Sequence, residues 1–143
     1  MEEQMRIFAL LILLIFPLGA QAQIRDSVFR DYQSYENFVD KAVYTRDFAR
    51  LIQTLGGRDE YTEEQLTSTV GVFLRIFPID FTSHAVTNVQ DLGGGFRREI
   101  RVYWQAGGFG YLYYYALLHN RGDDLVVLKF NMNTDVDVIF DQY

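Results

Sequence analysis

The hydrophobic period of the sequence changes once, near Phe81, and this change constrains the fold more than any other feature. Before Phe81, apolar residues recur at spacings of three and four, which is the pattern of amphipathic helices. After it, apolar and polar residues alternate, which is the pattern of β-strands. A helical half followed by a strand half predicts an α+β domain.

Two or three N-terminal helices are expected. Residues 34–55 read as helical, with two apolar stripes that fall out of phase near Thr45, where we expect a kink or a break. The next helix is expected to begin at Thr62, because Thr62 and Gln65 have the spacing of a capping box. Pro78 is expected to stop it.

Four strands are expected after the helices, separated by the turn-like segments LGGGF, AGGF and NRGD. Their expected ranges are Ala85–Asp91, Phe96–Gln105, Phe109–His119 and Leu125–Met132. Short separators of this kind predict an antiparallel meander, with the helices packed on one of its faces. The segment NTDVDVIFDQY either adds a short fifth strand or trails at the end of the chain.

The expected register follows from the turns, taken as Gly107-Gly108 and Arg121-Gly122. It pairs Trp104 with Tyr111, Val102 with Tyr113, Ile100 with Tyr115, and then the same tyrosines with Met132, Phe130 and Leu128. One face then collects the apolar residues and is expected under the helices: Phe96, Ile100, Val102, Trp104, Tyr111, Tyr113, Tyr115, Leu117, Val126, Leu128, Phe130 and Met132. The other face is expected to be solvated: Arg97, Glu99, Arg101, Tyr103, Tyr114, Lys129 and Asn131.

The three inward tyrosines leave two interpretations open. They fill a hydrophobic core, or they line a partly hollow cleft between helices and sheet, because a buried tyrosine hydroxyl needs a hydrogen-bond partner that a ligand could supply. The residues expected to bind a ligand in such a cleft are Trp104, Tyr111, Tyr113, Tyr115 and Arg98.

One set of residues could carry out acid–base chemistry. In the expected register, His119 lies opposite Phe96 on one side and Asp124 on the other, and Asp91 joins the same row across Phe96. A histidine beside a carboxylate can act as a general base. The alternative is an ordinary solvated sheet edge, where residues next to turns are commonly charged.

The N-terminus has the pattern of a secretory signal peptide. An apolar run at residues 7–18 precedes the small-x-small site Ala20-Gln21-Ala22, which predicts cleavage after Ala22. Translation is expected to start at Met5, because Glu2 and Glu3 are acidic where a basic region is usual. Residues 1–22 are then the signal peptide and residues 23–143 a single domain, periplasmic or secreted, with no membrane segment after cleavage. A buried or membrane-anchoring N-terminal helix is the other interpretation.

Charge and residue types argue against several functional classes. The chain has a formal net charge of −6 and no clustered basic stripe, so nucleic-acid binding is not expected. It has no cysteine, hence no disulfide and no thiolate metal site. The segment from Asn131 resembles a calcium loop, but Val136 and Gln142 stand where an EF-hand requires Gly and Glu. We expect neither a metal nor a cofactor.

The element order resembles the cystatin-like and nuclear-transport-factor-2-like α+β architecture, and the chain as a whole is similar to small exported bacterial proteins. The resemblance implies a cone-shaped cleft between helices and sheet, used by some relatives for small ligands and by others for protein contacts. We therefore expect non-enzymatic binding of a small apolar-polar ligand or a partner protein. The alternative is an isomerase or dehydratase type of enzyme that uses His119 with Asp124 or Asp91.

Overall fold

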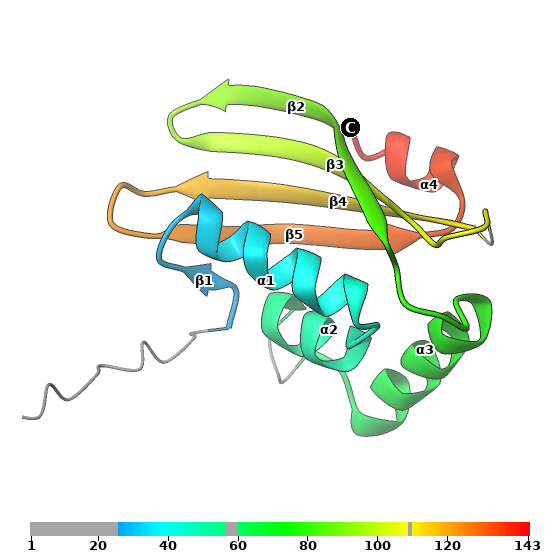
Figure 1. The fold of residues 1–143 in the computed structure, drawn as a ribbon. Coiled ribbons are helices and arrows are strands. Elements are labelled where there is room, and N and C mark those ends of the chain that lie inside the picture. Colours follow the sequence, from blue (N-terminus) through cyan, green and yellow to red (C-terminus); the bar gives the residue numbers. More distant parts are fainter. Residues whose placement is uncertain (1–25, 57–59, 109) are drawn as a thin grey trace, which may run out of the picture.

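The computed structural model describes residues 26–56, 60–108 and 110–143, so the expected cleavage site and start codon lie outside the described residues. The described residues form an α+β fold, which confirms the expected class (Figure 1). Its elements, in chain order, are β1 (Val28–Phe29), α1 (Tyr32–Tyr44), α2 (Phe48–Gly56), α3 (Glu63–Ile76), β2 (Ser83–Gly93), β3 (Phe96–Trp104), β4 (Tyr111–Asn120), β5 (Leu125–Asn133) and α4 (Val136–Phe140).

The first helical region is broken where the sequence predicts a break. Asp31 caps α1 by accepting a hydrogen bond from the Ser34 backbone N–H at 2.7 Å. The helix ends at Tyr44, and Arg46 adopts a left-handed conformation with φ of 56° before α2 begins. This break turns α2 away from α1, so that the two helices bury different apolar stripes.

Helix α3 begins with the expected capping box. The Thr62 side chain accepts from the Gln65 N–H at 3.1 Å, and the Gln65 side chain accepts from the Thr62 N–H at 3.0 Å. The helix ends at Ile76, before Pro78. Unlike α1 and α2, α3 has no fully buried residue; it packs loosely, with Leu66 and Phe73 only partly covered.

The sheet is antiparallel and has the strand order β1-β5-β4-β3-β2. Strands β2 to β5 form the expected meander. Two elements differ from the expectation: β1 adds a two-residue edge strand beside β5, and the C-terminal segment forms the short helix α4. The described chain therefore has a five-stranded sheet, not a four-stranded one.

The expected register is confirmed for one hairpin and wrong for the next. Strands β3 and β4 pair Trp104 with Tyr111 and Ile100 with Tyr115, as the Gly107-Gly108 turn predicts. Between β4 and β5, however, Tyr115 pairs with Asn131 instead of Leu128. The connecting loop is longer than expected, because Asn120 pairs with Leu125. The register then shifts again at Leu117/Leu118, where β5 contains a bulge at Leu128.

The expectation of which sheet face the helices cover is wrong for β3 and β4, although Phe130 and Met132 of β5 do lie on the covered face as expected. Helices α1 to α3 pack on the face that carries Tyr103, Leu112 and Tyr114, which we call the inner face. The opposite, outer face carries Ile100 and Tyr115, which α4 covers through Ile139, so the helices are not all on one face. The cause is twofold: the polar residues of the inner face are buried in pairs, and the bulge reverses the phase of β5.

Candidate functional site

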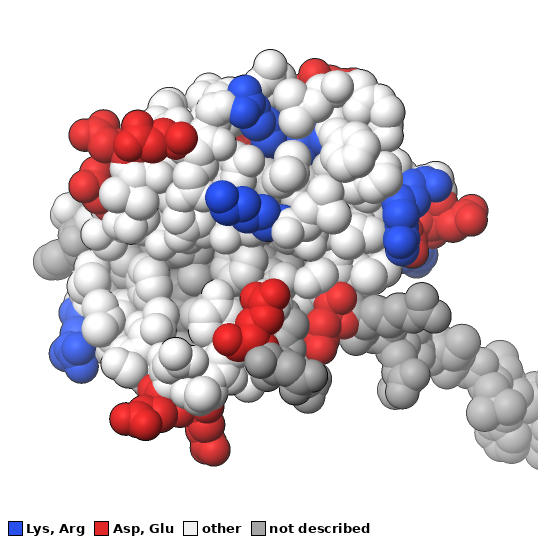
Figure 2. Space-filling view, turned by 180° about the vertical axis from the view of Figure 1, so that it is seen from behind, with Lys and Arg blue, Asp and Glu red and all other residues white. Residues whose placement is uncertain are grey.

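The aromatic residues expected to bind a ligand lie together, but on the outer face. The Trp104 and Tyr111 ring centroids are 6.3 Å apart, and those of Tyr111 and Tyr113 are 6.4 Å apart. Tyr111 is 51% exposed, whereas Tyr115 is 4% exposed beneath α4. Figure 2 shows that charged side chains are sparse on this side of the molecule. The expected place of these residues, a cleft under the helices, is contradicted; their role in ligand binding stays a prediction.

Arg98 and His119 also lie on the outer face and make contacts of their own. The His119 ring stacks on Phe96 at a centroid distance of 4.0 Å, across the expected β3–β4 pair. Arg98 donates from Nε to the Gln90 side chain at 2.7 Å, and its guanidinium lies 4.3 Å from the centre of the Tyr143 ring. Both side chains are thus packed against neighbours on the sheet.

The carboxylates expected beside His119 do not share its cross-strand row. His119 pairs with Phe96 and Val126, whereas Asp91 pairs with Arg97 on the inner side of the hairpin. Asp124 lies in the β4–β5 turn, where it accepts from Arg121 Nη2 at 2.5 Å. The row on which the isomerase or dehydratase alternative rested is therefore not formed.

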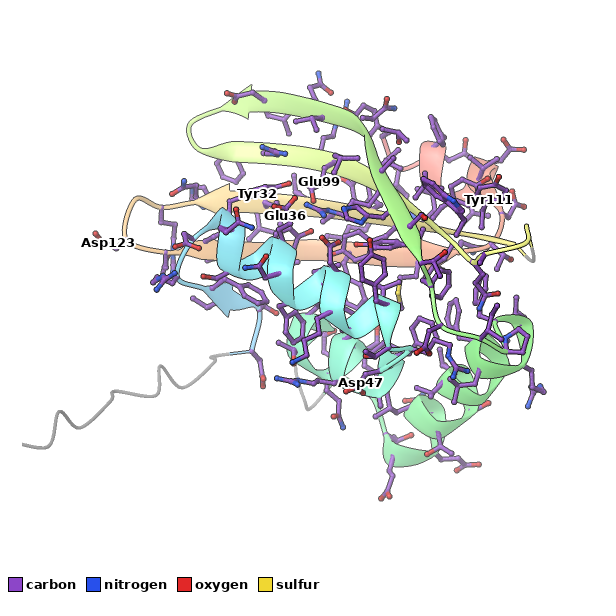
Figure 3. All side chains as sticks on the ribbon, viewed as in Figure 1. Tyr32, Glu36, Asp47, Glu99, Tyr111 and Asp123 are labelled. Atoms are coloured by element: carbon purple, nitrogen blue, oxygen red, sulfur yellow. The ribbon has the colours of Figure 1, made fainter. Side chains whose placement is uncertain are left out.

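A network of charged and tyrosine side chains lies between α1 and the inner face, and the sequence analysis missed it. Glu99 and Arg101 are both 0% exposed. Figure 3 shows Glu99 close to Tyr32 and Glu36 where α1 crosses the sheet, with Tyr111 well apart from them. The members of this buried network are Tyr32, Tyr35, Glu36, Asp40, Arg97, Glu99, Arg101, Tyr103 and Tyr114.

Hydrogen bonds inside the buried network satisfy Glu99 and Arg101. Glu99 accepts from Tyr32 at 2.8 Å, Tyr35 at 3.1 Å and Arg101 Nε at 2.7 Å. Arg101 also donates to Glu36 at 3.1 Å and to Asp40 at 3.2 Å. Because buried charges are tolerated only when paired and hydrogen-bonded, this arrangement explains how polar residues can fill the face that was expected to be solvated.

The buried network changes the acidity of its members. Burial, and next to it the charge of Glu99, raises the pKa of Tyr32 to about 12. Burial alone would lower the pKa of Arg101, but the carboxylate of Glu99 beside it raises that pKa well above its ordinary value. Tyr32 therefore remains protonated, and Arg101 remains charged, across the physiological pH range.

At one end of the buried network, His84 lies between a carboxylate and a phenol. His84 Nε2 is 3.4 Å from Asp40 Oδ2, and Nδ1 is hydrogen-bonded to the Tyr44 hydroxyl. Asp40 also accepts from the Tyr103 hydroxyl at 2.6 Å. A signal for this cluster is present in the sequence: Glu36, Asp40 and Tyr44 recur every four residues on one face of α1.

A concave apolar site lies elsewhere, between α2, α3 and β5. A cavity of about 110 Å³ opens there, and it is lined mainly by apolar side chains, with Thr69 and Asn131 as polar members: Ile52, Tyr61, Leu66, Thr69, Phe73, Phe130, Asn131 and Met132. It is small because ring and methyl groups from three elements surround it. The loose packing of α3 leaves this space between helices and sheet.

A second, larger hollow of about 280 Å³ shares two residues with this cavity, Tyr61 and Phe130. Its lining comes from the start of the described chain, the end of α2 and the middle of β5: Ser27, Leu55, Gly56, Glu60, Tyr61, Leu128, Lys129 and Phe130. Gly56 allows both rings to lie close to the backbone of α2, because a Cβ there would be 3.0 Å from Tyr61 and 3.4 Å from Phe130. We call the two hollows together the β5 groove.

Comparison of the chain with protein-family models, with curated proteins and with solved structures finds no match. The resemblance to the cystatin-like and nuclear-transport-factor-2-like architecture thus stays a prediction. In the described ranges, no group of three or more His, Cys, Asp and Glu side chains is arranged to hold a metal ion. None of the helices in the described part of the chain is long and apolar enough to span a membrane.

Proposed function

We propose that this protein is a non-enzymatic binding domain and that the β5 groove receives an apolar group of a small ligand or of a partner protein. The observation that carries the proposal is the apolar cavity between α2, α3 and β5. Binding sites are usually concave and mostly apolar, with a few polar groups that orient the ligand. Here Thr69 and Asn131 supply those polar groups.

The size of the groove supports a modest ligand group. The apolar cavity measures about 110 Å³ and the second hollow about 280 Å³. Ligand pockets begin at about 300 Å³, and an apolar cavity of about 150 Å³ can hold benzene. Export to the periplasm or the medium, indicated by the pattern at residues 1–22, forms part of the same proposal.

Binding of benzene to the purified protein tests the proposal. We expect benzene to shift the methyl NMR signals of Ile52, Leu66 and Met132, because these side chains line the cavity. Thr69→Phe places a ring in the cavity and should abolish the shifts. Thr67→Phe is the matched control, since Thr67 lies on α3 at a shallow surface beside Glu63; it should leave the shifts intact.

Two results would count against the proposal. In the first, benzene leaves the signals of the lining methyl groups unchanged in the unmodified protein. In the second, Thr69→Phe and Thr67→Phe affect the shifts equally, which would place the benzene outside the cavity.

A further inference from the structure

Strand β5 has a partner strand along only part of the edge that faces away from β4. Within the described residues, β1 pairs with it at Leu125 and Val126, and the Val127 N–H donates to the Ser27 carbonyl at 2.8 Å. From Leu128 to Asn133, no strand of the described part pairs with β5 on that side. Figure 1 shows β1 beside one end of β5 only. An unpaired edge of this kind presents N–H and C=O groups to any strand that can approach it.

Ser27, the residue before β1, does not have strand geometry. Ser27 has φ of 66°, in the left-handed region, which an extended strand does not use. Its N–H donates to the Thr54 carbonyl at 2.6 Å, and its hydroxyl donates to the Leu55 carbonyl at 2.5 Å. These bonds attach Ser27 to the end of α2. Ser27 therefore does not extend β1 in strand conformation.

The β5 groove runs along this uncovered part of β5. On the β5 side, the second hollow is lined by Leu128, Lys129 and Phe130, and the apolar cavity by Phe130, Asn131 and Met132. The opposite wall comes from α2, α3 and Tyr61. Strand β1, an extended segment, already occupies the first part of the same edge, opposite Leu125 and Val126.

From these observations we infer that the β5 groove binds an extended segment of a partner polypeptide, which adds a strand to the β5 edge beyond β1. This inference rests on the proposed function and names its ligand class. The segment forms main-chain hydrogen bonds with β5, and alternate side chains enter the cavity beside Phe130 and Met132.

The charges and the bulge narrow this ligand class further. The groove presents one acidic side chain, Glu60, and one basic side chain, Lys129, so it favours a segment without net charge. The bulge at Leu128 bends β5 just past the end of β1. The added strand therefore pairs with residues from Lys129 to Asn133, as a separate strand and not as an extension of β1.

The test uses a displayed library of random nine-residue peptides, selected on the full-length mature protein. We expect enrichment of peptides with apolar residues at alternate positions. Amide hydrogen exchange with the best peptide should show new protection at every second residue between Lys129 and Asn133. Protection at β2, the other edge of the sheet, would overturn the assignment to β5, and so would the absence of enrichment.

N-methylation of the selected peptide separates strand pairing from simple apolar binding. In an added strand, every second amide of the peptide faces β5 and the amides between them face away. Methylating the amides that face β5 removes their hydrogen bonds and should weaken binding by about tenfold or more, whereas methylating the amides that face away should have little effect. If both sets of methylated peptides bind with the same affinity, strand addition is wrong.

The benzene experiment distinguishes that failure from a failure of the proposed function. If benzene shifts the methyl signals but the two sets of N-methylated peptides bind equally well, the groove is an apolar binding site that does not pair with a strand. Sedimentation could instead show a dimer in which the same β5 amides are protected without any peptide. That result would place a second copy of the chain in the groove and overturn the proposal of a partner polypeptide.

Discussion

Glu99 and Arg101, two residues apart on β3, form an ion pair of 2.7 Å in which neither side chain is exposed to solvent. Such a pair is costly to bury, and it is retained here because α1 supplies further partners, among them Tyr32 and Glu36. The pair fixes how α1 lies on the sheet. It also identifies the inner face, which the apolar pattern alone does not.

Removal of Arg101 should strongly destabilise the protein. Arg101→Met leaves three carboxylates of the buried network with Arg97 as their remaining guanidinium, and breaking a buried pair in this way costs about 3–5 kcal/mol. Arg97→Met is the control, because the Arg97 side chain is 35% exposed; it should cost no more than about 1 kcal/mol. Urea unfolding measures both values. Equal costs for the two variants would mean that Arg101 is not buried as described.

The free energy of unfolding should fall steeply in alkali. Burial raises the pKa of Tyr32 from 10.0 to about 12 and also raises the pKa of Tyr35 and Tyr103. The folded state therefore holds these protons more tightly than the unfolded state, so their contribution is complete below pH 10 and is lost as the pH rises through 12. Unfolding experiments across this range should show the loss, and Tyr32→Phe should make it less steep. If Tyr111→Phe, at an exposed tyrosine outside the buried network, has the same effect, the assignment is wrong.

Two neighbouring residues of β4 test which sheet face the helices cover. Leu112 is 0% exposed on the inner face, whereas Tyr111 is 51% exposed on the outer face. We expect Leu112→Ala to cost about 2–5 kcal/mol in denaturant unfolding. Tyr111→Ala should cost less than about 1 kcal/mol. The reverse order would restore the face assignment expected from the sequence.

The β2–β3 turn contains one glycine that no other residue can replace without strain in its surroundings. A Cβ at Gly95 would be 2.2 Å from the Asn120 carbonyl oxygen, whereas a Cβ at Gly94 would be 3.7 Å from its nearest neighbour, on Phe96. Both glycines have positive φ, so Gly94→Ala controls for backbone strain. We expect about 1–2 kcal/mol for Gly94→Ala and more than about 3 kcal/mol for Gly95→Ala, measured by thermal unfolding. Similar costs would argue against the close approach of the turn to β4.

The parts of the fold that depend on local chemistry could be predicted from the sequence. Thr62 and Gln65 cap α3 because their spacing alone decides the bonds, and the Gly107-Gly108 turn gives the β3–β4 register. The β5 register depends on an extra residue at Leu128, which nothing in its hydrophobic alternation indicates. One such residue moves every later side chain to the opposite face.

The sites could be predicted less well than the fold. Arg97, Glu99 and Arg101 alternate as a solvated strand does, and only the matching row of Glu36, Asp40 and Tyr44 on α1 could have suggested that this face is buried. The β5 groove could not be predicted, because it depends on where β1 stops and on how loosely α3 packs.

The most direct test of the account is a crystal structure of the protein under xenon, which binds in apolar cavities. The account predicts a xenon atom between α2, α3 and β5, in contact with Ile52, Phe73 and Met132. A structure in which the Phe73 or Phe130 ring fills that space, and in which xenon does not enter it, would contradict the existence of a binding groove beside β5.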